Sequence, residues 1–285
     1  MLQEALRSVR EQSFADYEII VVDDGSTDGT VEHLAAHAPG LHVIHQPHRG
    51  PGAARNAGIA AAQGVYVAFL DSDDAWFPWT LQTYRQAILQ HGEPAFLTGA
   101  ALPWERKGDA VAQETMTTCF PDLLHACDGD MPPVNGTPSI CLRSDILRAS
   151  GGFAAQNMNA EDVDLWLRLG DAPGFVRIHA PAVFAQRKHE GNVSRAVAPS
   201  VVGASHLVRE ERAGVYPGGV RFEGRRRRII AANARSVILA ALRQGMIQDA
   251  WRLLRETFSW QFQFRHLRFL AAFPFLVVRA ACARR

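Results

Sequence analysis

The sequence predicts an α/β protein with a mainly parallel sheet covered by helices on both faces, followed by a helical C-terminal extension. Short apolar runs alternate with helical patterns between residues 2 and 187, and such alternation is typical of parallel strands joined by crossover helices. From about residue 199 only the helical period remains. A chain of 285 residues is long enough for one large domain with an appendage. We therefore expect a catalytic domain over residues 1–198 and a helical extension over 199–285.

The individual elements follow from hydrophobic period and from the turn residues between them. The predicted helices cover residues 2–12, 30–37, 77–91 and 161–169, together with the tail. A further, Ala-rich helix has a glycine-rich entry at residues 50–58 and ends near Gly64. The predicted strands cover residues 18–22, 41–45, 65–70, 96–100, 138–142, 176–179 and 183–187. Residues 101–137 contain four prolines and are expected to be irregular. A loop of that length in a compact domain is usually functional.

Three carboxylates follow the strand expected at 65–70, namely Asp71, Asp73 and Asp74. Like charges this close repel and lose solvation near a core, so a compensating group is expected. Hard Mg²⁺ or Mn²⁺ prefers carboxylates together with phosphate oxygens, and ligands of open α/β sheets sit beyond the carboxyl ends of the strands. The pattern therefore indicates a divalent-cation site. Taken alone, it also fits an acidic turn that only ends a strand.

Three further motifs carry charged groups at element ends. Asp23 and Asp24 follow the strand at 18–22, and Arg55 lies in the first turn of a glycine-rich helix, where free N–H groups attract phosphate. Glu161 and Asp162 open the helix at 161–169. Each motif has a structural alternative: a strand-end cap, a surface ion pair, and acids favoured by the helix dipole.

Together these motifs resemble the inverting nucleotide-sugar glycosyltransferases of family 2, which have the GT-A fold. The resemblance covers about residues 2–195, with the motifs in the order of the family. The residues that carry it are VVDDGSTDGT (21–30), GAARNAG (52–58), FLDSDD (69–74), GGF (151–153), AEDVDLWLRL (160–169) and RKHEGNVS (187–194).

The resemblance implies a role for each matching residue on the donor side. Asp23 and Asp24 would contact the nucleobase, most often uracil, and Arg55 would serve the nucleotide. Asp71 would face the ribose. Asp73 would hold the Mn²⁺ or Mg²⁺ that bridges the diphosphate. Because the nucleobase in the family is most often uracil, the donor would be a UDP-sugar.

On the acceptor side, the resemblance implies that Asp162 is the general base on the acceptor hydroxyl, with Glu161 beside it. His189 would add a metal or diphosphate contact, although a surface or core histidine is the more frequent case. The reaction would transfer a sugar with inversion to a glycan or lipid-linked acceptor. Synthesis of a cell-surface polysaccharide or glycolipid is the expected context.

Two other enzyme classes and a non-catalytic protein are the alternatives. Gly50-Pro51-Gly52 after a strand, with Asp71 some twenty residues on, partly fits a dinucleotide-dependent oxidoreductase. Against it, Arg55 occupies the third glycine position, and the acidic motifs would have no role. A sugar nucleotidyltransferase would need a glycine-rich N-terminal loop that the sequence lacks. A truncated glycosyltransferase-like scaffold would bind no nucleotide.

Charge is divided unevenly along the chain. Residues 221–285 carry 14 Arg and three acidic residues, a balance of +11, whereas the whole chain has a net charge of +1. An arginine-rich helical tail favours either packing on the catalytic domain or peripheral contact with an anionic membrane. No motif for reading nucleic acid accompanies the charge. Four cysteines without paired spacing favour a reduced, cytoplasmic protein, with possible contact at the inner face of the cell membrane.

The family pattern usually begins with an apolar strand and a Pro-x-Tyr-Asn-like turn ahead of the helix that matches 2–12. Met1 stands inside the position of that turn. We therefore expect the natural start to lie upstream of Met1, with about ten residues rich in Val and Ile before the turn.

Overall fold

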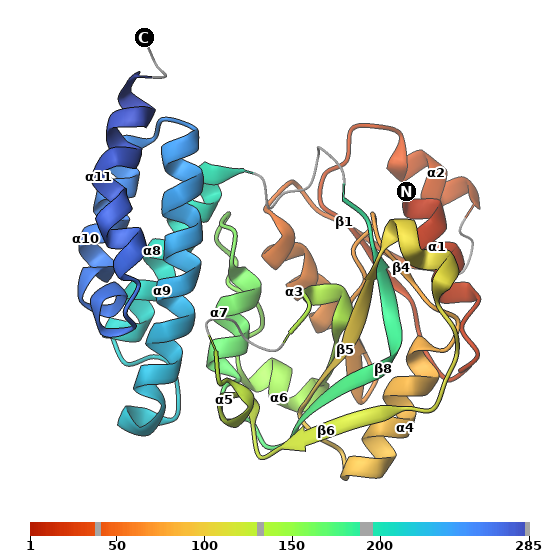
Figure 1. Ribbon diagram of the computed structural model, residues 1–285. Helices are drawn as coiled ribbons and strands as arrows, with labels where there is room; N and C mark the ends of the chain where they lie inside the picture. The colour runs from red at the N-terminus through yellow and green to blue at the C-terminus, as the bar shows by residue number, and fades with distance from the viewer. Residues whose placement is uncertain (38–40, 130–133, 189–195, 283–285) are drawn as a thin grey trace. The chain divides into compact units, whose positions relative to one another are not determined.

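The computed structural model describes residues 1–37, 41–129, 134–188 and 196–282 (Figure 1). It contains two compact units. The first comprises Met1–Ala126, Pro133–Asn157 and Asp171–His189, and the second comprises Cys127–Pro132, Met158–Gly170 and Glu190–Arg285. The α/β class with C-terminal helices is confirmed. The predicted domain boundary near residue 198 stays a prediction; in the compact units, residues 158–170 group with the C-terminal helices.

A six-stranded sheet forms the centre of the first unit, with the order β3-β7-β5-β8-β4 and with β6 paired to β8. The strands are β3 (Tyr66–Ala68), β4 (Ala75–Trp76), β5 (Phe96–Pro103), β6 (Met116–Phe120), β7 (Ile140–Arg143) and β8 (Phe175–Gln186). Only β5 and β8 run parallel in it, and the other four pairings are antiparallel. The sheet is thus mixed, where the sequence predicted mainly parallel strands. Between β5 and β7 the described residues contain β6 and only short helices, so no crossover helix of the kind that joins parallel strands is found there.

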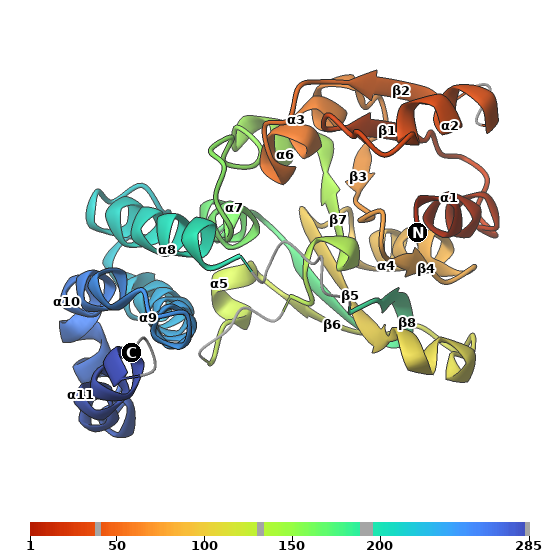
Figure 2. The ribbon, with the colours of Figure 1, turned by 90° about the horizontal axis from the view of Figure 1, so that it is seen from above.

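A second, two-stranded sheet is formed by β1 (Ile20–Asp23) and β2 (His42–His45), which run parallel. Figure 2 shows this pair beside β3 and β7. Among the described strands, none pairs with the remaining edge of β1 or of β3.

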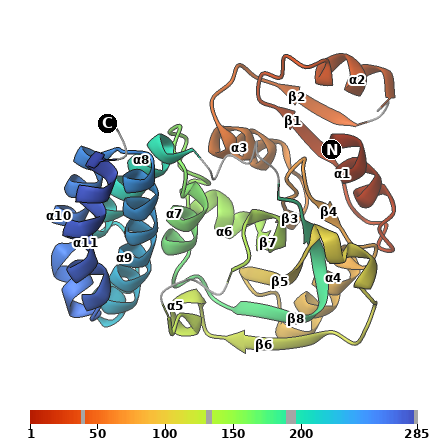
Figure 3. The same cartoon turned by 45° about the horizontal axis from the view of Figure 1, so that its top comes forward.

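Helices cover both sides of the six-stranded sheet, as predicted. The aromatic and aliphatic core on one side includes Trp76, Tyr84, Val183 and Phe184, and Val9 packs against it. The helices on this side are α1 (Leu2–Arg10) and α4 (Thr80–His91). On the opposite side lie α3 (Pro51–Ala61) and α6 (Ser144–Ala149), as Figure 3 shows. The remaining helix before α3 is α2 (Thr30–His37).

The segment 101–137 differs from the expected irregular loop. It holds the end of β5, the 3₁₀ helices η1 (Trp104–Asp109) and η2 (Thr137–Ser139), the edge strand β6, and α5 (Leu123–Ala126). β6 is short, and its side chains are exposed or only half-buried, so its sequence lacks the apolar run that marks a buried strand. Pairing with β8 over five residues is what orders it. β8 itself is one strand where the sequence predicted two short ones.

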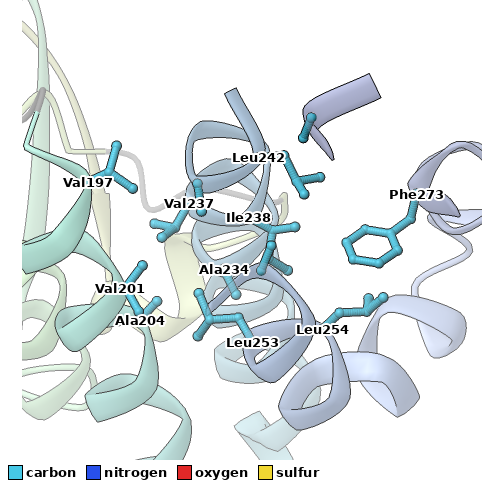
Figure 4. Close-up of a cluster of buried hydrophobic side chains, with 13 residues drawn as sticks. Val197, Val201, Ala204, Ala234, Val237, Ile238, Leu242, Leu253, Leu254 and Phe273 are labelled. Carbon is cyan, nitrogen blue, oxygen red and sulfur yellow. The ribbon is translucent and has the colours of Figure 1, made fainter. Parts of the chain in front are cut away.

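The second unit is helical. Its helices are α7 (Glu161–Arg168), α8 (Val197–Arg212), α9 (Gly219–Arg243), α10 (Ile247–Gln263) and α11 (Leu267–Cys282). Figure 4 shows their shared core, in which Val201, Ile238, Leu253 and Phe273 are buried. α11 continues through Pro274, although a proline inside a helix usually kinks or ends it. The preceding Phe273 is 1% exposed and packs edge-on against Trp251 at 4.7 Å between ring centroids, and this packing offsets the lost backbone hydrogen bond.

Within the described residues, no helix combines the length and the apolar content that crossing a bilayer requires.

Candidate functional site

The three carboxylates after β3 converge in space. Asp71, Asp73 and Asp74 each offer an oxygen, and these oxygens all lie within 4.8 Å of one another. Asp74 is buried, whereas Asp71 and Asp73 are half-buried. Burial, together with the charges of the two neighbours, raises the pKa of Asp74 to about 7, and the hydrogen bond from the Arg187 backbone opposes the rise only in part. Asp74 therefore resists ionisation beside the other two carboxylates.

Arg187 holds the acidic loop from the end of β8. Its backbone N–H donates to Asp74 Oδ1 at 2.8 Å, and its Nε donates to the Asp73 carbonyl oxygen at 3.1 Å. The guanidinium also pairs with Glu4 at 2.6 Å and lies 3.4 Å from the centroid of the Trp104 ring. In the sequence, Arg187 stood out only as part of the RKHEGNVS motif. Its contact with the loop depends on the antiparallel pairing of β4 with β8, which no local pattern indicates.

Arg55 reaches the same loop from the first turns of α3. Its Nη2 donates to Asp71 Oδ1 at 2.9 Å, and its side chain is 16% exposed. The guanidinium carbon lies 5.2 Å from the centroid of the Phe153 ring. The ring of Phe153 in turn meets Phe69, at the end of the strand segment, edge-on at 5.4 Å. Arg55 is therefore fixed by an ion pair on one side and by an aromatic face on the other.

The motif around Gly152 and Phe153 is locked to α3 by a reciprocal pair of hydrogen bonds. Asn56 Nδ2 donates to the Phe153 carbonyl oxygen, and the Phe153 N–H donates to Asn56 Oδ1, both at 2.8 Å. Gly152 has a φ of +71°, and a Cβ there would meet Asn56 Oδ1 at 2.4 Å. Only glycine fits this position. Two motifs almost a hundred residues apart thus form one rigid support for Arg55.

Asp23 and Asp24 fix the loops between β1 and α3. Asp24 accepts the backbone N–H groups of Arg49 and Gly50 at 2.9 and 2.8 Å, and Gln46 donates to it at 2.6 Å. Asp23 accepts the Ser26 N–H at 3.2 Å. Burial alone would raise the pKa of both acids, but these hydrogen bonds hold both pKa values below the usual range. Both side chains are thus ionised, Asp23 in the turn after β1 and Asp24 at the entry to α3.

Glu161 and Asp162 begin α7 in the second unit. Glu161 is 8% exposed, and the Asp162 carboxylate accepts the N–H of Val163 at 2.7 Å. Asp162, unlike Glu161, lines a cavity of about 470 Å³ in this unit.

Asp164 anchors α7 to the C-terminal helices. Its carboxylate accepts hydrogen bonds from Arg168 at 2.8 Å and from Tyr216 at 2.9 Å, and lies 3.1 Å from His206 Nε2. Burial would raise its pKa, but His206, Arg168 and Tyr216 together hold the pKa below its usual range. The structure gives it a buried network that sets the position of the Asp162 turn.

Among the described residues, the predicted site residues fall into three groups, and Asp23 and Asp24, on the loops between β1 and α3, form the first. Arg55, Asp71 and Asp73 come together in the first unit, joined by Asp74, which the sequence placed only as part of the acidic run. Glu161 and Asp162 stand together at the start of α7. His189 lies outside the described residues.

Comparison with known proteins is consistent with this arrangement. Residues 1–100 match the family model described as glycosyl transferase family 2. A putative teichuronic acid biosynthesis glycosyltransferase of Bacillus subtilis, TuaG, is 36% identical over 180 residues, which cover 55% of this chain and 70% of that protein. For two uncharacterized glycosyltransferases, of Nostoc and Rickettsia, the chain spans only about a quarter of their length, 26% and 27%.

Two solved structures share the fold. Residues 1–349 of Staphylococcus aureus TarS, in complex with UDP-GlcNAc, align with a TM-score of 0.56 at 18% identity over 93% of this chain and 88% of that one. The Pyrobaculum calidifontis mannosyltransferase in complex with GDP-Man and Mn²⁺ aligns with a TM-score of 0.51 at 19% identity over 99% and 82%. The fold is that of the GT-A glycosyltransferases. With the sequence motifs and the match to TuaG, the chain belongs to glycosyl transferase family 2.

Proposed function

We propose that the protein transfers a sugar from a nucleoside diphosphate donor, a UDP-sugar, to an acceptor hydroxyl with inversion, in a reaction that requires a divalent cation. The observation that carries this proposal is the convergence of Asp71, Asp73 and Asp74 within 4.8 Å, with Arg55 paired to one member. The TarS structure contains UDP-GlcNAc, which supports the choice of donor. The family relationship supports the reaction class.

The donor diphosphate would lie against a cation held by Asp73, with Asp71 and Asp74 beside it. Three carboxylates, one with its pKa raised to about 7, are a donor set that Mn²⁺ or Mg²⁺ fits, and the Mn²⁺ in the mannosyltransferase structure supports this assignment. Bound there, the cation would neutralise the charge of the leaving diphosphate as a Lewis acid.

The residues of the chain would supply position and charge. Arg55 is already oriented by Asp71 and Phe153. Its side chain would therefore lose little conformational freedom when the nucleotide binds. Arg187 keeps the backbone of the acidic loop in place through Asp73 and Asp74. Asp24 keeps the entry to α3 in place, and Asp23 keeps the turn after β1 in place. By family resemblance, both would border the nucleobase.

On the acceptor side, Asp162 would take the proton from the attacking hydroxyl. It is half-buried at a helix N-terminus and lines a cavity, whereas Glu161 is buried beside it. An ionised carboxylate is sufficient as base when the transition state resembles an oxocarbenium ion and the proton leaves late. A single displacement of this kind inverts the anomeric centre.

The biological setting that we propose is synthesis of a cell-surface polysaccharide or glycolipid on the cytoplasmic side of the membrane. The name of TuaG, which refers to teichuronic acid biosynthesis, supports it.

The second unit would contact anionic lipid through α10 and α11, which expose Phe262, Phe275 and Val278 at 63, 77 and 63% next to several arginines. In sedimentation with phosphatidylglycerol vesicles at low salt, the full chain should be found in the pellet with the vesicles. A variant with both Phe262→Ser and Phe275→Ser should stay in the supernatant. An intact chain that stays in the supernatant would contradict this contact.

The reaction class is tested by incubating the protein and Mn²⁺ with UDP-glucose, UDP-GlcNAc and GDP-mannose, and by following release of the nucleoside diphosphate. Hydrolysis of a UDP-sugar, with an α-linked donor giving the β-sugar first by NMR, is the expected outcome. A protein that binds none of the three donors is a non-catalytic member of the family.

A further inference from the structure

Three side chains of the first unit meet at one guanidinium beside the acidic loop. Arg187, directly after β8, pairs through Nη2 with Glu4 of α1 at 2.6 Å. Its guanidinium carbon lies 3.4 Å from the centroid of the Trp104 ring, at the start of η1. Through Nε, the same side chain donates to the carbonyl oxygen of Asp73 at 3.1 Å. We refer to Glu4, Trp104 and Arg187 as the Arg187 clamp, and all three belong to the first compact unit.

The register of the sheet explains why these residues meet. β5 and β8 run parallel with Pro103 opposite Gln186, so the residues that follow, Trp104 and Arg187, leave neighbouring strands at the same end of the sheet. β4 runs antiparallel along the other side of β8, so the acidic loop that precedes β4 lies at this end as well. The clamp therefore depends on two strand pairings and on no local sequence pattern.

Arg187 contacts two residues of the acidic loop through different groups. The Nε bond fixes the backbone of Asp73, the proposed metal ligand. The backbone N–H of Arg187 donates to Asp74 Oδ1 at 2.8 Å and fixes the orientation of that carboxylate. A shift of Arg187 would therefore change how the carboxylates of Asp73 and Asp74 stand toward each other.

Glu4 and Trp104 supply what keeps the guanidinium in place. A long arginine side chain loses much rotamer entropy when it is fixed, and a single bond to one carbonyl oxygen would compete with water. The ion pair with Glu4 and the face of the Trp104 ring add two contacts, and the Arg187 side chain is 23% exposed. Glu4 also offsets the positive charge of Arg187, which would otherwise repel a cation at Asp73.

We propose that Glu4 and Trp104 are positioning residues that act through Arg187 to set the affinity of the acidic loop for its divalent cation. Neither residue is itself a ligand. Groups that orient metal ligands from outside the coordination shell typically change metal affinity by about 10- to 100-fold. The inference rests on the proposed function, because it requires a cation at the acidic loop, but Mn²⁺ binding alone tests it.

The first test compares variants of Trp104. Binding of Mn²⁺ to the full chain without nucleotide is measured from the EPR signal of free Mn²⁺. Trp104→Ala should weaken Mn²⁺ binding about tenfold, whereas Trp104→Phe, which keeps an aromatic face, should stay within about threefold of the wild type. Lys107→Ala is the matched control, because Lys107 lies over the same ring at 4.8 Å from its centroid, and it should bind Mn²⁺ as the wild type does. Equal Mn²⁺ affinity in wild type and Trp104→Ala would overturn the role of Trp104.

The second test concerns Glu4. Glu4→Gln keeps an oxygen that can accept from Arg187 but removes the negative charge beside the guanidinium. The positive charge near the cation then rises, and Mn²⁺ binding should weaken about threefold. Glu11→Gln, at an exposed acid of the same helix, should leave Mn²⁺ binding unchanged. A Glu4→Gln chain that binds Mn²⁺ as tightly as the wild type, or more tightly, would contradict the role of Glu4.

A double-mutant cycle shows whether Trp104 acts through Arg187. Arg187→Lys keeps the positive charge but loses the planar fork of donors, so it should weaken Mn²⁺ binding about tenfold. In that background, Trp104→Ala should cost less than about twofold more, because the contact that it removes is already lost. Losses that add in full would show that Trp104 acts independently of Arg187. A purely structural role would lower the Tm in both backgrounds and leave Mn²⁺ affinity unchanged, and either result overturns the proposal.

Failure of this inference differs from failure of the proposed function. A wild-type chain that binds Mn²⁺ and UDP, while Trp104→Ala and Glu4→Gln bind Mn²⁺ equally well, keeps the transferase and loses the clamp. A wild-type chain that binds no Mn²⁺ loses the cation site of the proposed function, and the role of the clamp with it.

Discussion

Arg55 donates a hydrogen bond to Asp71 at 2.9 Å, and this ion pair joins the first turns of α3 to the acidic loop after β3. Asp71 therefore has the Arg55 guanidinium as a positively charged partner. The guanidinium is held on its other side by Phe153. The pair places a positive charge at the edge of the proposed diphosphate site before any ligand binds.

Replacing Arg55 by Gln should lower the affinity for UDP. The loss should be about 10- to 100-fold, because a hydrogen bond to a charged group contributes ~1.5–3 kcal/mol. Calorimetric titration with UDP in Mn²⁺ measures it. Arg85→Gln is the matched control, since Arg85 is exposed and lies over the Phe14 ring at 5.7 Å. Equal UDP affinity in Arg55→Gln and wild type would remove Arg55 from the nucleotide site.

Asp74 should make the metal-free protein less stable as the pH rises. Its pKa in the folded protein is about 7, above the ordinary 3.8, because burial and the neighbouring carboxylates penalise its charge. The folded state therefore holds a proton that the unfolded state has released, and the free energy of unfolding falls between about pH 4 and pH 7.

Thermal unfolding in EDTA at pH 5 to 8 measures this effect. Asp74→Asn should flatten the fall in Tm with pH, since its Oδ1 still accepts the Arg187 N–H at the same place. Asp16→Asn, at an exposed acid, should retain the slope of the wild type. Parallel curves for wild type and Asp74→Asn would show that Asp74 is not the titrating group.

Asp162→Asn should reduce kcat far more than it reduces donor affinity, because a general base acts only in the transition state. A loss of 10²- to 10⁴-fold is the usual range for such a group, so about that is expected. Glu161→Gln is the comparison, and transfer to the acceptor is the assay. A larger loss of kcat in Glu161→Gln would assign the base to Glu161.

Asp164→Ala should destabilise the second unit. Asp164 is 2% exposed, and its removal leaves Arg168, His206 and Tyr216 without their shared acceptor. Breaking a buried network of this type costs about 3–5 kcal/mol. Urea unfolding measures the change, and Asp171→Ala, at an exposed acid, should shift the free energy of unfolding by less than about 0.5 kcal/mol. A loss below 1 kcal/mol for Asp164→Ala would show that the network is not a structural anchor.

Much of the fold was predictable because its signals are local. The strands with apolar runs and the helices with a 3.6-residue period formed near the expected positions, as α4 (Thr80–His91) and α10 (Ile247–Gln263) show. The direction of strand pairing was not predictable in this way. β6 has no apolar run of its own, and β7 runs antiparallel to both of its neighbours. Those features depend on partners distant in sequence.

The same difference between local and distant signals applies to the candidate site. Asp71, Asp73 and Arg55 were identified because their motifs sit at element ends, where chemistry is expected. The contacts that hold them were not. Arg187 reaches the acidic loop, and Asn56 reaches Phe153, across 113 and 97 residues.

We expect the acidic cluster to bind a nucleoside diphosphate through a divalent cation, and replacing Asp73 tests this most directly. Calorimetric titration of UDP into the wild-type chain should give binding in Mn²⁺ and at least tenfold weaker binding in EDTA. Asp73→Asn should show the weak binding under both conditions while its circular dichroism spectrum stays that of the wild type. Equal UDP affinity in Mn²⁺ and in EDTA, or an Asp73→Asn chain that binds as the wild type does, would contradict the account.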